Sequence, residues 1–131
     1  MADKMSFELV SPERKLAEGE ADMVIIPGME GDLGAMPGHA PFLTTLRPGL
    51  VTVTDGSSST EYFVTGGFAE VSPAGAAVLA EEAVERSALD RAFLDAKIEA
   101  ATKAVETAGD DNRQAAGQRL NDLQTVAEQL L

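Results

Sequence analysis

The segment Pro27–Pro41 constrains the fold more than any other part of the chain, because it holds four glycines and three prolines in fifteen residues. Proline fixes φ and lacks an amide hydrogen, whereas glycine allows positive φ, so this density excludes the interior of a helix or of a central strand. The segment also contains His39, the only histidine of the chain. We therefore expect an ordered loop system here, of the kind that carries binding contacts on a rigid scaffold.

From Phe7 to about Ala80 the sequence alternates short apolar runs with turn-forming residues, a pattern typical of β-strands. Residues 50–54 alternate apolar and polar side chains and end at Asp55 and Gly56, which favours a hairpin turn. The expected strands cover residues 7–10, 21–26, 50–54, 60–65, 68–71 and 76–80. Many short strands with few helical signals predict an N-terminal β-sandwich or flattened barrel, which we place at residues 1–83.

After about Glu81 the apolar residues recur with a helical period. Ser87 is the expected cap of a first helix, with Asp90 reaching back as in a capping box. Gly109–Asp111 ends this helix and can cap the next. The two apolar stripes are Leu94, Ile98, Ala101, Val105 and Ala108, then Ala116, Leu120, Leu123, Ala127 and Leu130. The short connection predicts a C-terminal antiparallel α-helical hairpin at residues 84–131, so the fold class is all-β plus α.

The composition limits the partners that this chain can have. The formal net charge is −12, with 11 acidic and 4 basic residues at positions 1–80 and 11 acidic and 6 basic residues at positions 81–131. A charge of this sign disfavours binding to nucleic acid and to anionic lipid headgroups. No apolar run approaches the roughly 20 residues that span a bilayer. We therefore expect protein partners, no nucleic acid and no direct membrane insertion.

No catalytic or metal-binding constellation is visible in the sequence. His39 has no nucleophile motif and no second histidine or cysteine beside it, so we expect it to bond loop backbone and fix the turn at Pro37 and Gly38. The glycines of this segment are not followed by the Lys of a phosphate loop. A small β-sandwich enzyme or carbohydrate binder would need a polar cluster or an aromatic platform, and one Tyr with no Trp or Cys argues against both. We expect no metal and no cofactor.

The spacing Pro-Gly-x-x-Gly-x-Leu-Gly-x-x-Pro-x-His-x-Pro over Pro27–Pro41 resembles the signature of the epsilon subunit of bacterial F-type ATP synthases, the counterpart of the mitochondrial delta subunit. Two further matches follow in the same order, at Gly66–Val71 and Val78–Ala83. Order, spacing and length agree over nearly the whole chain. The resemblance implies a non-catalytic central-stalk (rotor) subunit that couples c-ring rotation to the catalytic head during ATP synthesis.

The resemblance also implies a position for the Gly/Pro-rich segment. In the family this region faces the membrane rotor ring, which gives Glu30, Gly31, Asp32 and His39 a c-ring contact role. Exposed carboxylates on such a loop would suit polar or basic loops of a ring of small subunits. The protein would then lie peripherally on the cytoplasmic face of the bacterial inner membrane, as part of the synthase.

The paired glycines Gly66 and Gly67 have two interpretations. From the residues alone they interrupt a strand and leave Phe68 in the core. The resemblance instead places Gly66, Gly67 and Phe68 near the central gamma subunit. The partners that it implies are gamma, the c-subunit ring and, as a further candidate through the tail, the alpha and beta catalytic subunits.

The helical tail of the family sometimes carries a nucleotide-sensing pattern, Ile/Leu-Asp-x-x-Arg-Ala. Leu89 and Asp90 match it, but Phe93 stands where the Arg belongs, and Arg91 comes two positions early, roughly 200° around a helix. We therefore expect no ATP binding. Asp90 and Arg91 would be the nucleotide-binding residues of the alternative, a nucleotide-sensing regulatory inhibitor acting through the tail. The net charge of −5 over residues 81–131 predicts at most weak inhibition of ATP hydrolysis, because the family's inhibitory contact is to an acidic segment of the beta subunit.

Overall fold

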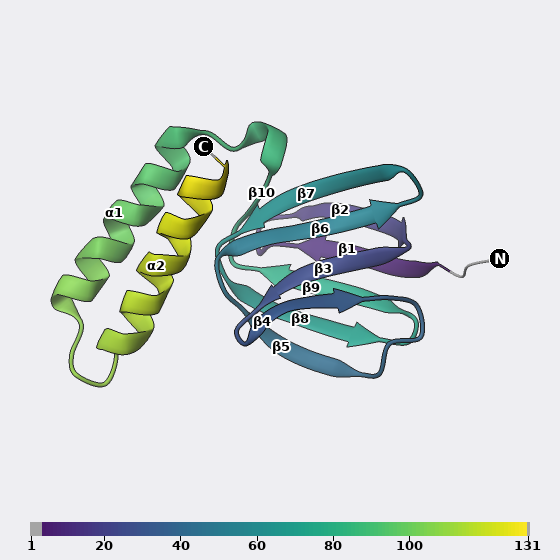
Figure 1. Cartoon of the computed structure of the whole chain (residues 1–131), viewed down its shortest axis with the longest axis horizontal. Helices are drawn as coiled ribbons and strands as arrows, with labels where there is room; N and C mark the ends of the chain where they lie inside the picture. Colours follow the sequence, from purple (N-terminus) through teal and green to yellow (C-terminus); the bar gives the residue numbers. More distant parts are fainter. Residues whose placement is uncertain (1–3, 131) are drawn as a thin grey trace. The chain divides into compact units, whose positions relative to one another are not determined.

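The computed structural model describes residues 4–130, so the outermost residues of the two predicted regions lie outside it. The chain divides into a β unit that ends at Arg86 and a helical unit that begins at Ser87 (Figure 1). This division falls beyond the predicted boundary at residue 83. The reason is a short strand, β10 (Ala83–Glu85), which continues the sheet by pairing with Tyr62–Val64.

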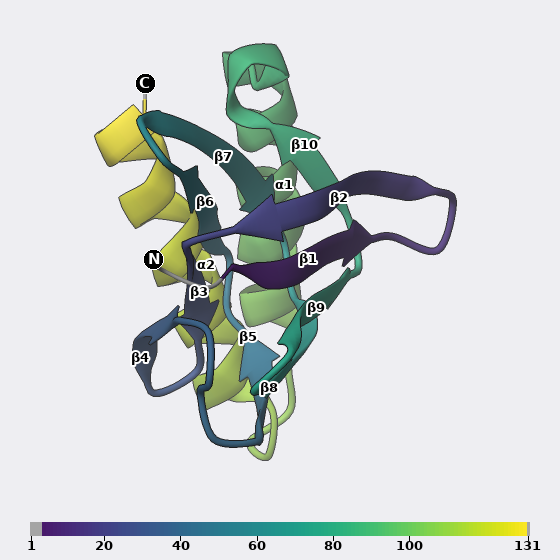
Figure 2. The same ribbon diagram turned by 90° about the vertical axis from the view of Figure 1, so that its right-hand side faces the viewer.

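The β unit is one ten-stranded sheet that closes on itself. Its strands are β1 (Met5–Val10), β2 (Lys15–Ala21), β3 (Met23–Gly28), β4 (Gly31–Ala35), β5 (Phe42–Leu46), β6 (Gly49–Asp55), β7 (Ser58–Val64), β8 (Gly67–Ser72), β9 (Gly75–Ala80) and β10. Their order is β10-β7-β6-β3-β5-β8-β9-β1-β2, with β4 paired to β3 outside this path. Near the two ends of the order β2 contacts β6, which closes the sheet as Figure 2 shows. The predicted β-sandwich or flattened barrel is confirmed.

The core of the β unit follows from strict alternation along the strands. In β1 the side chains of Met5, Phe7 and Leu9 are buried, while Ser6 and Glu8 face outward. Each fully buried side chain of this size contributes about 1.5–3 kcal/mol of hydrophobic stabilisation. The other buried members are Ala21, Val24, Ile26, Ala35, Leu46, Val51, Val64, Ala69, Val71, Ala76, Val78 and Ala80. The core is therefore almost wholly aliphatic.

The expectation of a loop over the whole Gly/Pro-rich segment is wrong for Pro27 and Gly28, which end β3, and for β4. Residues 31–35 form a strand that pairs with β3 from Gly28↔Gly31 to Val24↔Ala35. Glycines are tolerated there because β4 has only one neighbour and lies at an edge, where a strand depends less on its own side chains. The remainder of the segment, after Ala35, is the loop that leads to β5.

The helical unit is the predicted antiparallel hairpin. Helix α1 (Arg91–Thr107) and helix α2 (Arg113–Leu130) pack against each other, with Leu94 and Leu123 fully buried (Figure 1). The expected cap at Ser87 is wrong, because Arg86–Ala88 form a short 3-10 turn and α1 starts later. In the part of the chain that the structure describes, no helix is both long and apolar enough to cross a membrane.

Candidate functional site

The β3–β4 hairpin carries three of the predicted contact residues. Met29 and Glu30 form its turn, and Gly28 and Gly31 close it as a cross-strand pair. Gly31 has a φ of +133°, which side chains disfavour. At Gly28 an added Cβ would lie 3.0 Å from the Gly31 carbonyl oxygen and 3.2 Å from Oγ1 of Thr44. Glycine therefore shapes this turn, and it leaves the Glu30 side chain exposed at the tip.

Asp32, the third contact candidate of the hairpin, is held by an arginine that sequence reasoning missed. Nη2 of Arg47 donates to Oδ1 of Asp32 at 2.7 Å, and Nε of Arg47 donates to the Gly28 carbonyl oxygen at 3.0 Å. One signal could have pointed to this residue: Arg47 is the only lysine or arginine between Lys15 and Arg86. The pairing itself depends on the register of β3, β4 and β5, which the sequence did not predict.

His39 lies in the loop between β4 and β5, away from the hairpin turn. Its backbone amide donates to the Met36 carbonyl oxygen at 3.0 Å, and its ring Nδ1 lies 2.6 Å from the Ala40 carbonyl oxygen. These are the loop-backbone bonds expected of a residue that fixes a turn. The turn at Glu30 and the His39 loop lie at opposite ends of β4 (Figure 1). The structure therefore does not bring His39 together with Glu30, Gly31 and Asp32.

The paired glycines at the start of β8 are required by the backbone. Gly66 and Gly67 have φ values of +155° and +125°, and an added Cβ on Gly67 would lie 2.0 Å from the Leu79 carbonyl oxygen. This irregularity precedes the alternation of β8, in which Ala69 is buried and Phe68 is 57% exposed. The interpretation of Phe68 as a core residue is wrong, since its side chain lies on the outer face.

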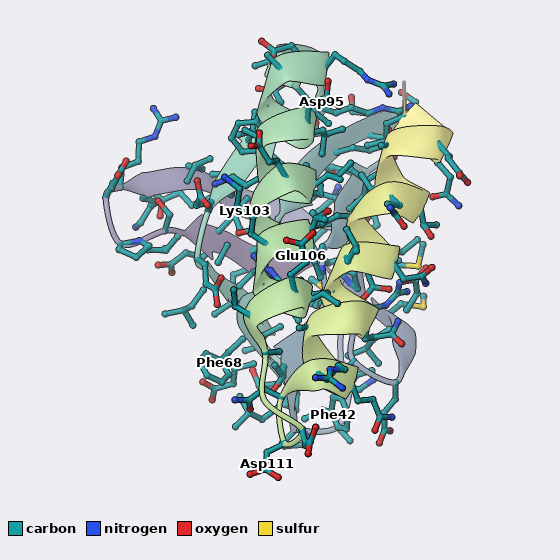
Figure 3. All side chains as sticks on the ribbon, turned by 90° about the vertical axis from the view of Figure 1, so that its left-hand side faces the viewer. Phe42, Phe68, Asp95, Lys103, Glu106 and Asp111 are labelled. Carbon is teal, nitrogen blue, oxygen red and sulfur yellow. The ribbon has the colours of Figure 1, made fainter. Side chains whose placement is uncertain are left out.

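Phe68 belongs to a group of exposed apolar side chains. In the register of the sheet Phe68 lies between Thr45 of β5 and Leu79 of β9, and Leu43 is two residues from Thr45 on the same face. Figure 3 shows Phe42 and Phe68 among the side chains that project from the β unit. We call Leu43, Phe68 and Leu79 the outer apolar patch. Isolated exposed apolar residues need no explanation, but neighbours on one face mark a candidate contact surface.

An acidic groove adjoins this patch on the same face. Its lining spans β1, β2, β8 and β9 and includes the small residues Gly19, Gly75 and Ala77. The register places Glu70 opposite Ala77 and Ala77 opposite Glu8, so carboxylates lie on both sides of Ala77. The acidic members are Glu8, Glu18, Glu20 and Glu70. A partner for this face would combine apolar with basic side chains.

The two candidate nucleotide-binding residues have local structural roles. Asp90 is the N-cap of α1, and its Oδ1 accepts from the Phe93 amide at 2.8 Å. Nε of Arg91 lies 3.3 Å from Oδ1 of Asp95, one turn further along the helix. Within residues 4–130 no group of three or more His, Cys, Asp or Glu side chains could hold a metal ion.

The sequence and the fold of the chain are similar to those of known proteins. The β-sandwich domain of the ATP synthase delta/epsilon chain matches residues 4–86. The ATP synthase epsilon chain of Parvibaculum lavamentivorans is 52% identical over 128 residues, covering 96% of this chain and 97% of that relative. The ATP synthase epsilon chain of Ruegeria sp. is 54% identical over 112 residues, covering 86% of this chain and 82% of that relative.

Two solved structures share the fold. A chain from the mitochondrial ATP synthase of Euglena gracilis aligns with a TM-score of 0.76 at 21% identity, over 98% of this chain and 82% of that one. A chain from the central stalk and c-ring of the Tetrahymena thermophila mitochondrial ATP synthase aligns with a TM-score of 0.69 at 14% identity, over 99% of this chain and 98% of that one. At these identities the likeness concerns the fold alone.

The class of protein is that of the delta/epsilon chains, in which a β-sandwich is followed by a helical hairpin. Identities of 52% and 54% with epsilon chains, over most of both chains, make the assignment narrower. The chain belongs to the ATP synthase epsilon-chain family, whose members are non-catalytic subunits of that complex.

Proposed function

We propose that this chain is a rotor subunit in the central stalk of a proton-translocating F-type ATP synthase, where it couples c-ring rotation to the catalytic head during ATP synthesis. The observation that carries the proposal is the 52% identity to an epsilon chain over 96% of this chain. A rigid, closed β unit with shaped surface turns suits a part that transmits torque. In this role the protein lies peripherally on the cytoplasmic face of the bacterial inner membrane.

The β3–β4 hairpin is the proposed c-ring contact. Its tip presents Glu30, and Asp32 lies on the following strand with a 64% exposed side chain. The Glu30 carboxylate suits polar or basic loops on the ring, and Asp32, whose Oδ1 is paired with Arg47, offers its exposed side chain to polar loops. His39 lies at the other end of β4. We propose that it contributes to the ring contact only indirectly, by fixing the shape of its own loop.

The outer apolar patch and the acidic groove are the proposed surface for gamma. Phe68 contributes an exposed aromatic ring, and aromatic residues are enriched among the dominant contacts of protein interfaces. Gly66 and Gly67 set the backbone that turns Phe68 outward. The carboxylates beside the patch would select a gamma surface that carries basic residues.

The tail is proposed to brace the rotor, with at most weak inhibition of ATP hydrolysis. The carboxylate of Asp90 is used as a helix cap, and Arg91 is paired with Asp95. Both would have to exchange these contacts to bind a nucleotide. The alternative, a nucleotide-sensing inhibitor, predicts binding of Mg-ATP by the isolated chain, which isothermal titration calorimetry at millimolar ATP measures.

The test of the rotor role uses membrane vesicles whose ATP synthase has been depleted of epsilon. The purified chain is added at one copy per complex, and ATP hydrolysis and ATP-driven proton pumping are measured in the same samples. We expect the chain to co-purify with the complex and to raise the number of protons pumped per ATP. A bound chain that lowers hydrolysis sharply would favour the inhibitor, and a chain that does not bind would refute the rotor role.

A further inference from the structure

We propose that Arg47 is a positioning residue for the ring-contact hairpin: by holding Asp32 and the end of β3, it fixes the direction in which Glu30 is presented. This inference rests on the proposed function, because the value of a fixed direction depends on a partner at the tip. Arg47 lies outside the hairpin, directly after β5, and it is not itself proposed to touch the ring.

The attachment of the hairpin to the sheet shows why it needs such a residue. Strand β4 pairs with β3 and lies off the path of the sheet. An open groove is lined by residues 28–33 of the hairpin and residues 42–45 of β5. The far strand of the hairpin therefore has space beside it, and it is held by its pairing with β3 and by contacts near the turn.

Arg47 provides those contacts from both its backbone and its side chain. Its amide donates to the Pro27 carbonyl oxygen at 3.0 Å, and its Nε donates to the Gly28 carbonyl oxygen at 3.0 Å. Its Nη2 donates to Oδ1 of Asp32 at 2.7 Å. Because Gly28 is on β3 and Asp32 is on β4, one planar guanidinium joins the two strands. Lysine, a single point donor, would not reproduce this fork.

The ion pair between Arg47 and Asp32 also lowers the net negative charge near the hairpin turn. The positive charge of Arg47 lies against Asp32 and offsets it. Glu30 makes no ion pair or hydrogen bond with the residues that the structure describes. The hairpin therefore presents one uncompensated carboxylate, at its tip, in a direction fixed by the Arg47 bridge.

The first experiment measures the hairpin in the isolated full-length chain. Hydrogen exchange at the amides of Met29–Leu33 should be roughly fivefold faster in Arg47→Gln, the size expected for an exposed ion pair. Arg47→Lys keeps the charge and loses the fork, so it should lie between wild type and Arg47→Gln. The matched control is Arg14→Gln, which removes the same charge at a site outside the hairpin. Equal exchange in all four proteins would overturn the proposal.

The second experiment measures coupling in the reconstituted synthase. In epsilon-depleted vesicles, Arg47→Gln should lower the protons pumped per ATP at least twofold relative to wild type, while Arg14→Gln should not.

The charge swap Asp32→Arg with Arg47→Asp, measured by hydrogen exchange in the isolated chain, can rebuild a salt bridge across the same two strands. It should recover at least half of the exchange protection that Arg47→Gln loses.

The outcomes separate the two proposals. If the wild-type chain does not raise coupling, the rotor role fails, and the exchange experiment still decides whether Arg47 holds the hairpin. If wild type raises coupling and both Arg47→Gln and Arg47→Lys match it, Arg47 has no positioning role. If Arg47→Gln does not fold, Arg47→Lys replaces it, and wild-type exchange and coupling in Arg47→Lys would overturn the proposal.

Discussion

The β unit and the helical unit differ in how much apolar surface each buries. The β unit has large side chains such as Leu9, Ile26 and Val78 at zero exposure, drawn from strands far apart in the sequence. In the helical unit the buried apolar residues are Leu94, Leu123, Val126 and two alanines. Since alanine buries little area and short helices are marginal in water, the β unit should hold its shape alone, whereas the hairpin should open more easily.

The largest expected effect breaks the β core. Leu9→Ala should lower the free energy of unfolding of the β unit by about 2–5 kcal/mol, because Leu9 is fully buried between neighbours on β2 and β9 and the cavity cannot collapse completely. Urea unfolding followed by β-unit NMR signals measures this loss. In Leu94→Ala the same signals should keep their midpoint while helical signals shift. A common shift of both sets would mean that the two units unfold as one.

The next effect tests the backbone at the start of β8. Gly67→Ala should destabilise the β unit by about 2–3 kcal/mol, because a Cβ there meets the Leu79 carbonyl oxygen and φ is +125°. The control is Gly34→Ala in β4, where the nearest atom to an added Cβ is Sδ of Met23 at 3.9 Å. We expect that change to be neutral or slightly stabilising. Thermal melts of the full chain compare the two, and an equal loss in both would remove the special role of Gly67.

The same substitution should have the opposite sign in the helical unit. Gly117 lies within α2, and an added Cβ would meet nothing within 4 Å. Gly117→Ala should therefore stabilise the helix by about 1 kcal/mol. Helical circular dichroism against temperature measures the gain. Loss of helical stability in this variant would mean that Gly117 is needed for a contact, and the view of the hairpin as a marginal unit would need revision.

The strands that the sequence predicted are those with clear burial alternation. Residues 7–10 and 50–54 correspond to β1 and β6, in which apolar and polar side chains alternate. Strand β2 (Lys15–Ala21) was missed because it lies at the end of the sheet order and six of its seven residues are charged residues, glycine or alanine. Edge strands carry such residues to prevent pairing with other chains. Alternation thus predicted most of the inner strands, but it missed the inner strand β5, whose burial does not alternate regularly, and the edge strands β2, β4 and β10.

The candidate sites depended on contacts that no local pattern contains. The sequence placed Glu30 and Asp32 in one exposed segment, which the structure keeps together. It could not predict that Arg47 bridges β3 and β4, since that requires the register of three strands. It also placed Phe68 in the core, because the paired glycines hid which face the strand presents. Side-chain direction after a backbone irregularity is a tertiary property.

The smallest expected effect concerns the acid sensitivity of the β unit. In the β unit the Asp22 carboxylate accepts from the Gly56 amide at 2.6 Å and lies 3.4 Å from Nζ of Lys4. The Gly56 bond, followed by the charge of Lys4, lowers the pKa of Asp22 below its ordinary value. Lys4 also pairs with Asp55, so this cluster joins the start of β1 to the β6–β7 turn.

A lowered pKa in the folded state means that Asp22 contributes stability above its unfolded pKa of about 3.9, and that this stability is lost as the pH falls through the folded value. Asp22→Asn should therefore lower the melting temperature of the β unit slightly at pH 7, and the difference from wild type should shrink as the pH falls below about 4. Melting both proteins from pH 7 to pH 3 measures this. A difference that stays constant over the range would mean that the Gly56 bond stabilises the turn through the shape of the side chain rather than its charge. In that case the Asp22 carboxylate would give the β unit no acid sensitivity of its own.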